Sequence, residues 1–202
     1  MDDGMRSSVC VQTIRQTLSS YQKVVGFMKG NVCNILGGPG CGKSTLAATL
    51  YVELKRQHID VEYVSEYAKE LVYQENSVAL KDQILVFAHQ YHRLWTAAQH
   101  THLVITDSPI LLSAIYNPDT SHHFTALVVE MHKKFDTLNI VLKRSSQVHT
   151  MVGRIHSLTE SVSIDNRIRT LLDEEQLEYA EFDPVHDNVQ PLVRLIRQEF
   201  VV

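Results

Sequence analysis

The chain has 202 residues, of which 44% are hydrophobic and 21% are charged, and its formal net charge is -4 at pH 7. This length predicts one α/β domain of ordinary size, and the composition excludes collagen-like, mucin-like and wholly disordered chains. The negative charge also excludes a protein that coats nucleic acid nonspecifically, so any contact with DNA would be local.

The first periodic segment of the chain is helical. Apolar residues from Val11 to Val25 recur at steps of three or four, which predicts a helix over about residues 9–28. We therefore expect an N-terminal helical extension over residues 1–30 and one larger domain over residues 31–202.

Short apolar runs then alternate with helical patterns. Strands are predicted at residues 32–36, 61–64, 103–106, 138–142 and 179–182, and helices at 43–57, 67–74, 78–99, 124–135, 162–176 and 189–200. This alternation predicts an α/β fold with a five-stranded parallel sheet sandwiched by helices. Residues 143–163 are polar and lack a sustained apolar period, which predicts a mobile lid.

Two stripes of residues run along the predicted helix 78–99. We expect the core stripe to be Leu80, Ile84, Ala88, Tyr91, Trp95 and Ala98. The neighbouring stripe contains Gln83, Phe87, Gln90 and Leu94, and it fits either the wall of a substrate pocket or a half-exposed boundary. In a pocket, Gln90 would pair with a nucleobase edge, Phe87 or Tyr91 would stack on the ring, and Arg93 would reach a phosphate.

The segment after the first strand matches the pattern G-x-x-x-x-G-K-[ST], with the sequence Gly37-Gly38-Pro39-Gly40-Cys41-Gly42-Lys43-Ser44-Thr45. In such a loop, glycines leave room for backbone N–H groups to surround phosphate oxygens. Lys43 would contact the β- and γ-phosphates, Ser44 would bind Mg²⁺, and Thr45 would contact the α-phosphate. The sequence therefore predicts an ATP-binding site from Gly38 to Thr45. Cys41 is either a redox-sensitive thiol or a small residue at a permissive position.

Two acidic residues directly follow predicted strands. Glu66 follows the second strand, where it would accept a proton from an attacking hydroxyl or would simply begin a surface helix. Asp107 follows the strand 103–106 in the Walker B arrangement and would hold Mg²⁺, although Asp-Ser-Pro also suits a helix N-cap. Because the carboxyl ends of parallel strands share one edge of a sheet, we expect both acids beside the phosphate loop.

Basic residues in and around the expected lid include Lys143, Arg144, Arg154, Arg167 and Arg169. Arg154 follows the flexible Gly153 and is predicted to close over the transferring phosphoryl group as a catalytic cation. The alternative is that these basic residues form a charged surface exposed to solvent.

These motifs resemble those of small phage-encoded and bacterial P-loop kinases, a group often classed with AAA-family ATPases. The resemblance covers about residues 31–172 and lies in residues 37–45, 64–69, 83–93, 104–109 and 153–154. The segment Glu66-Tyr67-Ala68 is also similar to that of nicotinamide riboside kinases. The resemblance implies a P-loop kinase domain over residues 31–202, which uses ATP with Mg²⁺.

We therefore predict Lys43, Glu66, Asp107 and Arg154 as catalytic residues, Ser44 and Asp107 as metal ligands, and Tyr67, Phe87, Gln90 and Arg93 as substrate contacts. The expected acceptor is a hydroxyl of a nucleoside, nucleotide or modified DNA base, with 5-hydroxymethyluracil in phage DNA favoured by the resemblance. The alternatives are a nicotinamide riboside or nucleoside monophosphate kinase, and a non-kinase P-loop ATPase that switches a partner protein.

The sequence also bears on location and acceptor. Three cysteines without metal-ligand spacing, no signal-like start and no long apolar run lead us to expect a cytoplasmic protein with no membrane contact, in a bacterium or a phage-infected cell. Asp107-Ser108-Pro109 departs from the Glu-Arg-Ser type motif of deoxynucleoside kinases, which argues against a simple nucleoside as acceptor.

Overall fold

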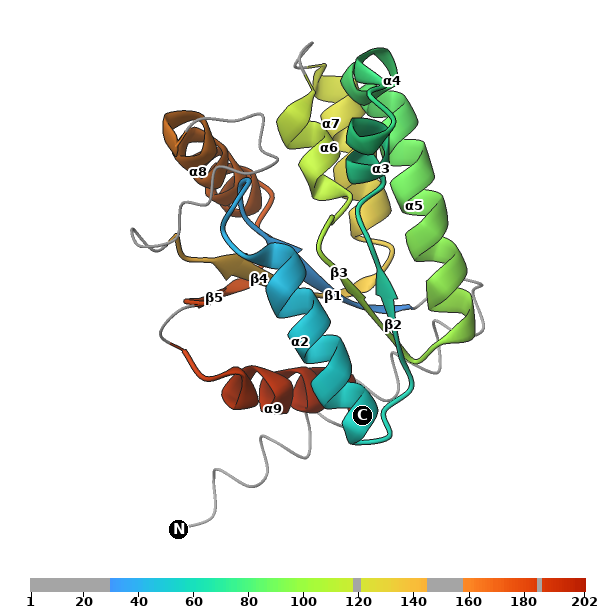
Figure 1. The fold of residues 1–202 in the computed structure, drawn as a ribbon, viewed down its shortest axis with the longest axis vertical. Helices are drawn as coiled ribbons and strands as arrows, with labels where there is room; N and C mark the ends of the chain where they lie inside the picture. The colour runs from blue at the N-terminus through green and yellow to red at the C-terminus, as the bar shows by residue number, and fades with distance from the viewer. Residues whose placement is uncertain (1–29, 118–120, 145–157, 185–186) are drawn as a thin grey trace.

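Five parallel strands form one sheet in the computed structural model of the chain, which describes residues 30–117, 121–144, 158–184 and 187–202 (Figure 1). The strands are β1 (Asn31–Leu36), β2 (Val61–Val64), β3 (Leu103–Thr106), β4 (Asp136–Leu142) and β5 (Tyr179–Phe182). Their order is β2-β3-β1-β4-β5, and every neighbouring pair is parallel. The predicted parallel sheet is confirmed, and β4 begins at Asp136, earlier than the sequence pattern indicates.

One face of the sheet is covered by α2 (Lys43–Arg56) and α9 (Val189–Phe200) (Figure 1). The side chains of β1 alternate between the two faces, as the strand period requires, and Cys33 and Ile35 point toward these two helices. They join a buried apolar cluster that includes Leu50 of α2 and Ile196 of α9. This cluster fixes α2 against the sheet and thereby fixes the loop that precedes α2.

The opposite face packs against a second set of helices. These are α5 (Gln83–His100), α6 (Leu111–Tyr116), α7 (His122–His132) and α8 (Leu158–Glu174), while α3 (Tyr67–Tyr73) and α4 (Ser77–Lys81) connect β2 to α5. Val32 and Leu36 of β1 lie in this second core with Leu94 of α5 and Ile168 of α8. The predicted sandwich of helices around the sheet is therefore confirmed.

The predicted helix 78–99 is wrong in two respects. It is divided into α4 and α5, because Asn76 caps α4 by accepting from Ala79 N, and Asp82 caps α5 by accepting from Leu85 N. The predicted core stripe is also misplaced, since Ile84 is 67% exposed. The buried residues of α5 are instead Val86, Phe87, Gln90, Leu94 and Ala98, which correspond largely to the stripe expected at a pocket wall or boundary.

Several predictions from the sequence lie outside the described residues. They are the helix 9–28 with the N-terminal extension, and most of the expected lid, including Gly153 and Arg154. Among the helices that the structure describes, none has the length and apolar content needed to span a bilayer.

The sheet brings the ends of three strands together. β3 lies between β2 and β1, so the segments that follow all three strands leave the same edge of the sheet. β2 and β3 lie on one side of β1, and the chain then crosses to β4 and β5 on the other side. This reversal creates the crevice at which open α/β sheets bind ligands.

A buried histidine gives the fold a pH-dependent stability. His132 is 2% exposed and lies 3.4 Å from Thr137 Oγ1, and burial lowers its pKa from 6.5 to about 4. The folded state disfavours the protonated ring, so stability is lost as the pH falls from about 6.5 toward 4. At about 1.4 kcal/mol per pKa unit, we expect the free energy of unfolding to fall by about 2–3 kcal/mol between pH 7 and pH 4.5 because of this residue.

Urea unfolding across this pH range checks the expectation. The His132→Gln variant should lose that share of the pH dependence, whereas His100→Gln, at an exposed position on α5, should keep it. An unchanged pH dependence in His132→Gln would show that the ring is not the group responsible.

Candidate active site

The phosphate loop occupies residues 37–42, between β1 and α2. Gly40 and Gly42 have φ angles of 81° and 96°, which residues with side chains rarely adopt. The first backbone hydrogen bond of α2 runs from Leu46 N to Gly42 O at 2.9 Å. The N–H groups of residues 43–45 therefore have no acceptor within the helix, which is the arrangement that binds phosphate.

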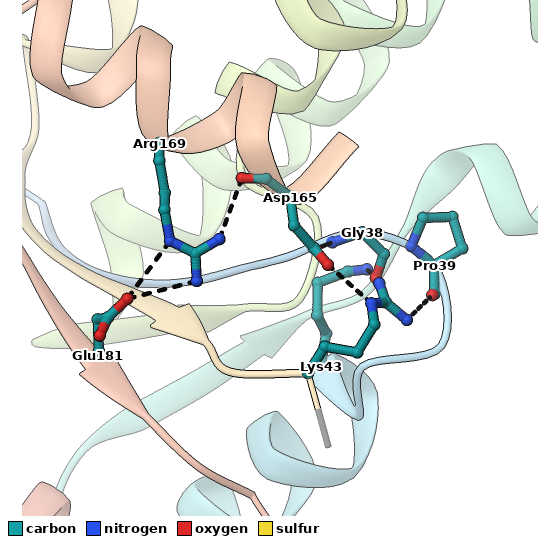
Figure 2. Close-up of polar contacts among 7 residues, drawn as sticks. Gly38, Pro39, Lys43, Asp165, Arg169 and Glu181 are labelled. Carbon is teal, nitrogen blue, oxygen red and sulfur yellow. Dashed lines mark hydrogen bonds and ion pairs between the residues drawn. The ribbon is translucent and has the colours of Figure 1, made fainter. Parts of the chain in front are cut away.

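Lys43 is half-buried at the start of α2 and folds back over this loop. Its Nζ donates to Gly38 O at 3.1 Å (Figure 2). Cys41 is buried, and its Sγ lies 2.5 Å from the position that a Cβ on Gly37 would occupy. Cys41 thus belongs to the buried apolar cluster that packs between the sheet and α2, whereas Lys43 remains partly exposed.

Glu66 follows β2 and occupies the N-cap position of α3. Burial raises the pKa of its carboxyl group above the usual 4.5, the positive charge of Lys43 opposes that rise, and the negative charge of Asp107 adds to it. The sheet order brings the segments after β2, β3 and β1 to one edge, so the charges of Lys43 and Asp107 both act on the Glu66 carboxyl group. A carboxyl group whose pKa lies above its usual value is a stronger base when ionised, so it is suited to accept a proton.

Asp107 follows β3 and is 3% exposed. Its Oδ1 atom is buried without a hydrogen-bond partner in the part of the chain that the structure describes. A buried carboxylate oxygen without a partner is costly unless a ligand satisfies it, and Mg²⁺ prefers such oxygens. This atom therefore fits a magnesium ion, which Asp107 and the exposed hydroxyl of Ser44 would hold.

Tyr63 and Tyr116 are residues near the site that the sequence reasoning missed. Burial, the charge of Asp107 and a hydrogen bond with Asp107 hold the pKa of Tyr63 well above its usual range, and a hydrogen bond with Ser44 opposes this rise. Burial and the charge of Glu66 likewise raise the pKa of Tyr116. The alternation of β2 could have indicated Tyr63, which lies two residues after the buried Val61, but the sequence shows no comparable signal for Tyr116.

Gln90, predicted to read a nucleobase, binds the backbone on both sides of Glu66. Its Oε1 accepts from Tyr67 N at 2.9 Å, and its Nε2 donates to Ser65 O at 3.2 Å. The side chain is 2% exposed, so these bonds fix the segment that carries the carboxylate. Its role as a substrate contact stays a prediction, and a positioning effect on Glu66 follows from the geometry.

We expect Gln90→Leu to leave Tyr67 N and Ser65 O without partners and to lower the free energy of unfolding by about 1–3 kcal/mol. Because Glu66 would then be poorly held, kcat should fall about tenfold at an unchanged KM for ATP. Gln83→Leu is the matched control, since the Gln83 amide donates to Leu80 O, away from Glu66. A change confined to the KM of the acceptor would favour base reading instead.

The other predicted substrate residues lie around α3 and α5. Arg93 donates to both carboxylate oxygens of Glu70, at 2.8 Å and 2.7 Å, and its guanidinium lies 5.1 Å from the centre of the Tyr67 ring. The Tyr67 ring stacks on His89 at 4.3 Å. Phe87 is 7% exposed and belongs to the apolar core. Their roles as substrate contacts stay predictions.

The helix α8 contacts the phosphate loop from outside. Asp165 of α8 accepts from Gly38 N at 2.5 Å, and Arg144, which follows β4, donates to Pro39 O at 3.0 Å. Arg144 was predicted only as one of several lid cations, and Asp165 was not predicted. Lys143 and Arg169, two other expected lid cations, pair with Glu181 of β5.

The arrangement of loop, lysine and acids corresponds to a known family, since residues 32–186 match the AAA domain family. The chain belongs to the AAA domain family. No curated protein matches this AAA domain.

Two solved structures with a similar fold are kinases by name. Thymidylate kinase from Ehrlichia chaffeensis is 11% identical, with a TM-score of 0.55, and the alignment covers 86% of this chain and 98% of that one. Deoxyadenosine kinase from M. mycoides, solved with dCMP and dCDP as products, is 17% identical, with a TM-score of 0.53 and coverage of 84% and 98%. The predicted P-loop α/β fold is thus confirmed, and at these identities the likeness concerns the fold alone.

Proposed function

We propose that this AAA domain is an ATP-dependent kinase that transfers the γ-phosphate of ATP to a hydroxyl group of a nucleoside, nucleotide or modified DNA base. The observation that carries the proposal is the Glu66 carboxylate, which follows β2 at the edge of the sheet that also holds the phosphate loop and Asp107, and whose pKa is raised by burial. The phosphate loop supplies the donor site, and the end of β2 supplies a base.

The base distinguishes two kinds of acceptor. An alcohol must lose its proton as its oxygen attacks phosphorus, and a nearby carboxylate can accept that proton. A phosphate monoester has a second pKa of about 6 and is mostly ionised at pH 7, so it needs no base. A half-buried acid with a raised pKa therefore favours an alcohol over a nucleoside monophosphate that accepts at its phosphate.

In the proposed reaction, the acceptor oxygen forms a bond to the γ-phosphorus while the bond from that phosphorus to the β–γ bridging oxygen breaks. Glu66 takes the hydroxyl proton, and ADP leaves with the bridging oxygen. Lys43 neutralises charge on the phosphate oxygens, and the backbone N–H groups of the loop bind them. Mg²⁺, held by Ser44 and Asp107, would neutralise further phosphate charge. Arg154 remains the proposed lid cation.

The proposal extends to one specific acceptor, the hydroxymethyl group of 5-hydroxymethyluracil in phage DNA. This extension rests on the resemblance of the motif residues alone. The hydroxymethyl group is a primary alcohol, which is the chemistry that Glu66 would serve.

Transfer of label from ATP radiolabelled at the γ-phosphate tests the proposal. The panel contains nucleosides, nucleoside monophosphates, nicotinamide riboside, and DNA with or without 5-hydroxymethyluracil. We expect label on a hydroxyl of at least one acceptor. Label on the phosphate of a monophosphate would overturn the alcohol assignment, and release of inorganic phosphate that requires a protein partner would favour an ATPase switch.

A further inference from the structure

An ion pair holds the outer side of the phosphate loop. Asp165 of α8 accepts from Gly38 N through Oδ1 (Figure 2 labels both residues). Its other oxygen, Oδ2, accepts from Arg144 Nε at 2.7 Å. Arg144 Nη1 donates to Pro39 O at 3.0 Å. Two consecutive residues of the loop are thus bound by one pair whose side chains are 13% and 8% exposed, for Arg144 and Asp165 respectively.

The loop leaves no room between itself and this pair. A Cβ on Gly38 would lie 2.6 Å from Ser161 O, 2.9 Å from Asp165 Oδ1 and 3.0 Å from Arg144 Nη2. Glycine is therefore required at position 38 by the close approach of α8. Arg144 and Asp165 therefore pack directly against the loop, with no space for solvent between them.

The contacts continue to the lysine of the phosphate site. Gly38 donates through its N–H to Asp165 and accepts through its carbonyl from Lys43 Nζ. Both polar groups of one residue are therefore engaged, one by the ion pair and one by the ammonium. The orientation of Gly38 links Asp165 to Lys43.

We propose that Arg144 and Asp165 are positioning residues for ATP binding, which hold Gly38 and Pro39 and thereby place Lys43. The proposal rests on the function proposed above only in taking ATP as the ligand. Asp165 supplies the acceptor for Gly38 N, and Arg144 cancels the negative charge that this acceptor brings close to the phosphates.

Two features separate this role from simple attachment of α8. First, an unpaired carboxylate at Gly38 would repel a triphosphate, so the arginine matters for ligand affinity as well as for packing. Second, Arg144 Nη2 is buried without an acceptor among the described residues. A buried donor without a partner lowers stability, so stability alone does not explain why an arginine is placed here.

Calorimetric titration with ATP in magnesium buffer tests the proposal, on wild-type protein, Arg144→Gln, Asp165→Asn and the double variant. Titrations are made well below each melting temperature, so that the affinity of folded protein is measured. Lys133→Gln is the control, because it also removes a cation from an ion pair. Lys133 pairs with Glu175 and precedes the start of β4, so it lies at the end of the sheet opposite the phosphate loop.

We expect Arg144→Gln to weaken ATP binding by about tenfold or more, since it leaves Asp165 uncompensated beside the loop. Asp165→Asn keeps an oxygen acceptor and should weaken binding by about threefold or less, and the double variant should return to within about threefold of Asp165→Asn. Lys133→Gln should bind as the wild type does.

Wild-type affinity for ATP and the effects of the variants answer different questions. A wild-type protein that does not bind ATP would overturn the proposed function. Wild-type affinity in Arg144→Gln, or equal losses in both single variants without recovery in the double variant, would overturn the positioning role. If Arg144→Gln does not fold, Asp165→Ala decides, because loss of the acceptor should weaken binding more than Asp165→Asn does, and equal affinities would contradict the proposal.

Discussion

Replacing Lys43 with alanine is expected to reduce phosphoryl transfer by about 10²–10³-fold at saturating ATP. The ammonium lies at the start of α2, over the phosphate loop, and in the structure it is held by Gly38 O at 3.1 Å. Without it, negative charge on the transferring phosphate would be neutralised by the loop N–H groups and, in the proposed mechanism, by Mg²⁺ and Arg154 alone. Initial rates of label transfer from ATP measure the loss.

The control for this variant is Lys55→Ala, on the same helix. Lys55 lies in the last turn of α2, where its ammonium is 5.6 Å from the centre of the Tyr51 ring. The control should retain wild-type transfer. A Lys43→Ala protein with rates within about threefold of wild type would show that residues 37–45 are not the donor site, since such an interaction is worth far more.

The second large effect is expected from Glu66→Gln, which should lower kcat by about 10²–10⁴-fold by removing the proton acceptor. The sign of the pH dependence follows from the raised pKa of Glu66, because the base is lost as the pH falls through the folded-state pKa. Wild-type activity should therefore decline on an acid limb that begins above pH 4.5, and Glu66→Gln should lack that limb. Rates measured from pH 4.5 to 8 provide the test.

The raised pKa of Glu66 also predicts that the Glu66→Gln variant is more stable than the wild type. A carboxyl group with a raised folded-state pKa favours its protonated form in the fold, so stability is lost as the pH rises from 4.5 through the folded-state pKa. Above the folded-state pKa that cost is fully present, and there Glu66→Gln should raise the melting temperature. Glu62→Gln, an exposed change on β2, the strand that precedes Glu66, should alter neither rate nor melting temperature. A loss in kcat of only a few fold would remove the support for an alcohol acceptor.

The strands of this fold could be predicted from the sequence because each is a short apolar run bounded by turn residues. β2, β3 and β5 begin and end at the predicted residues. The long helix before β3 was not predicted correctly, because its apolar residues fit two adjacent stripes. Two side-chain caps, Asn76 and Asp82, decide where it divides.

The candidate site was predictable where chemistry is encoded in consecutive residues. The phosphate loop and Asp107 each form a local motif next to a strand, and the structure brings both to one edge of the sheet. The pairing of Arg144 with Asp165 could not be predicted, because it joins two segments across the expected lid. The double contact of Gln90 with the Glu66 segment depends on how α5 packs beside β2.

The division of the interior into two apolar clusters has a consequence for inherited variation. The phosphate loop is held by α2, which packs with α9 in one apolar cluster. The segment with Glu66 is held by Gln90 of α5, which packs over the other apolar cluster. A substitution that creates a cavity near Phe200 would weaken ATP binding. A cavity near Leu94 would instead impair the reaction of the acceptor alcohol. Cavities near α9 and cavities near α5 thus fall into two kinetic groups. Cavities beneath α8 would weaken ATP binding, although α8 packs on the same side of the sheet as α5, because Asp165 contacts the phosphate loop.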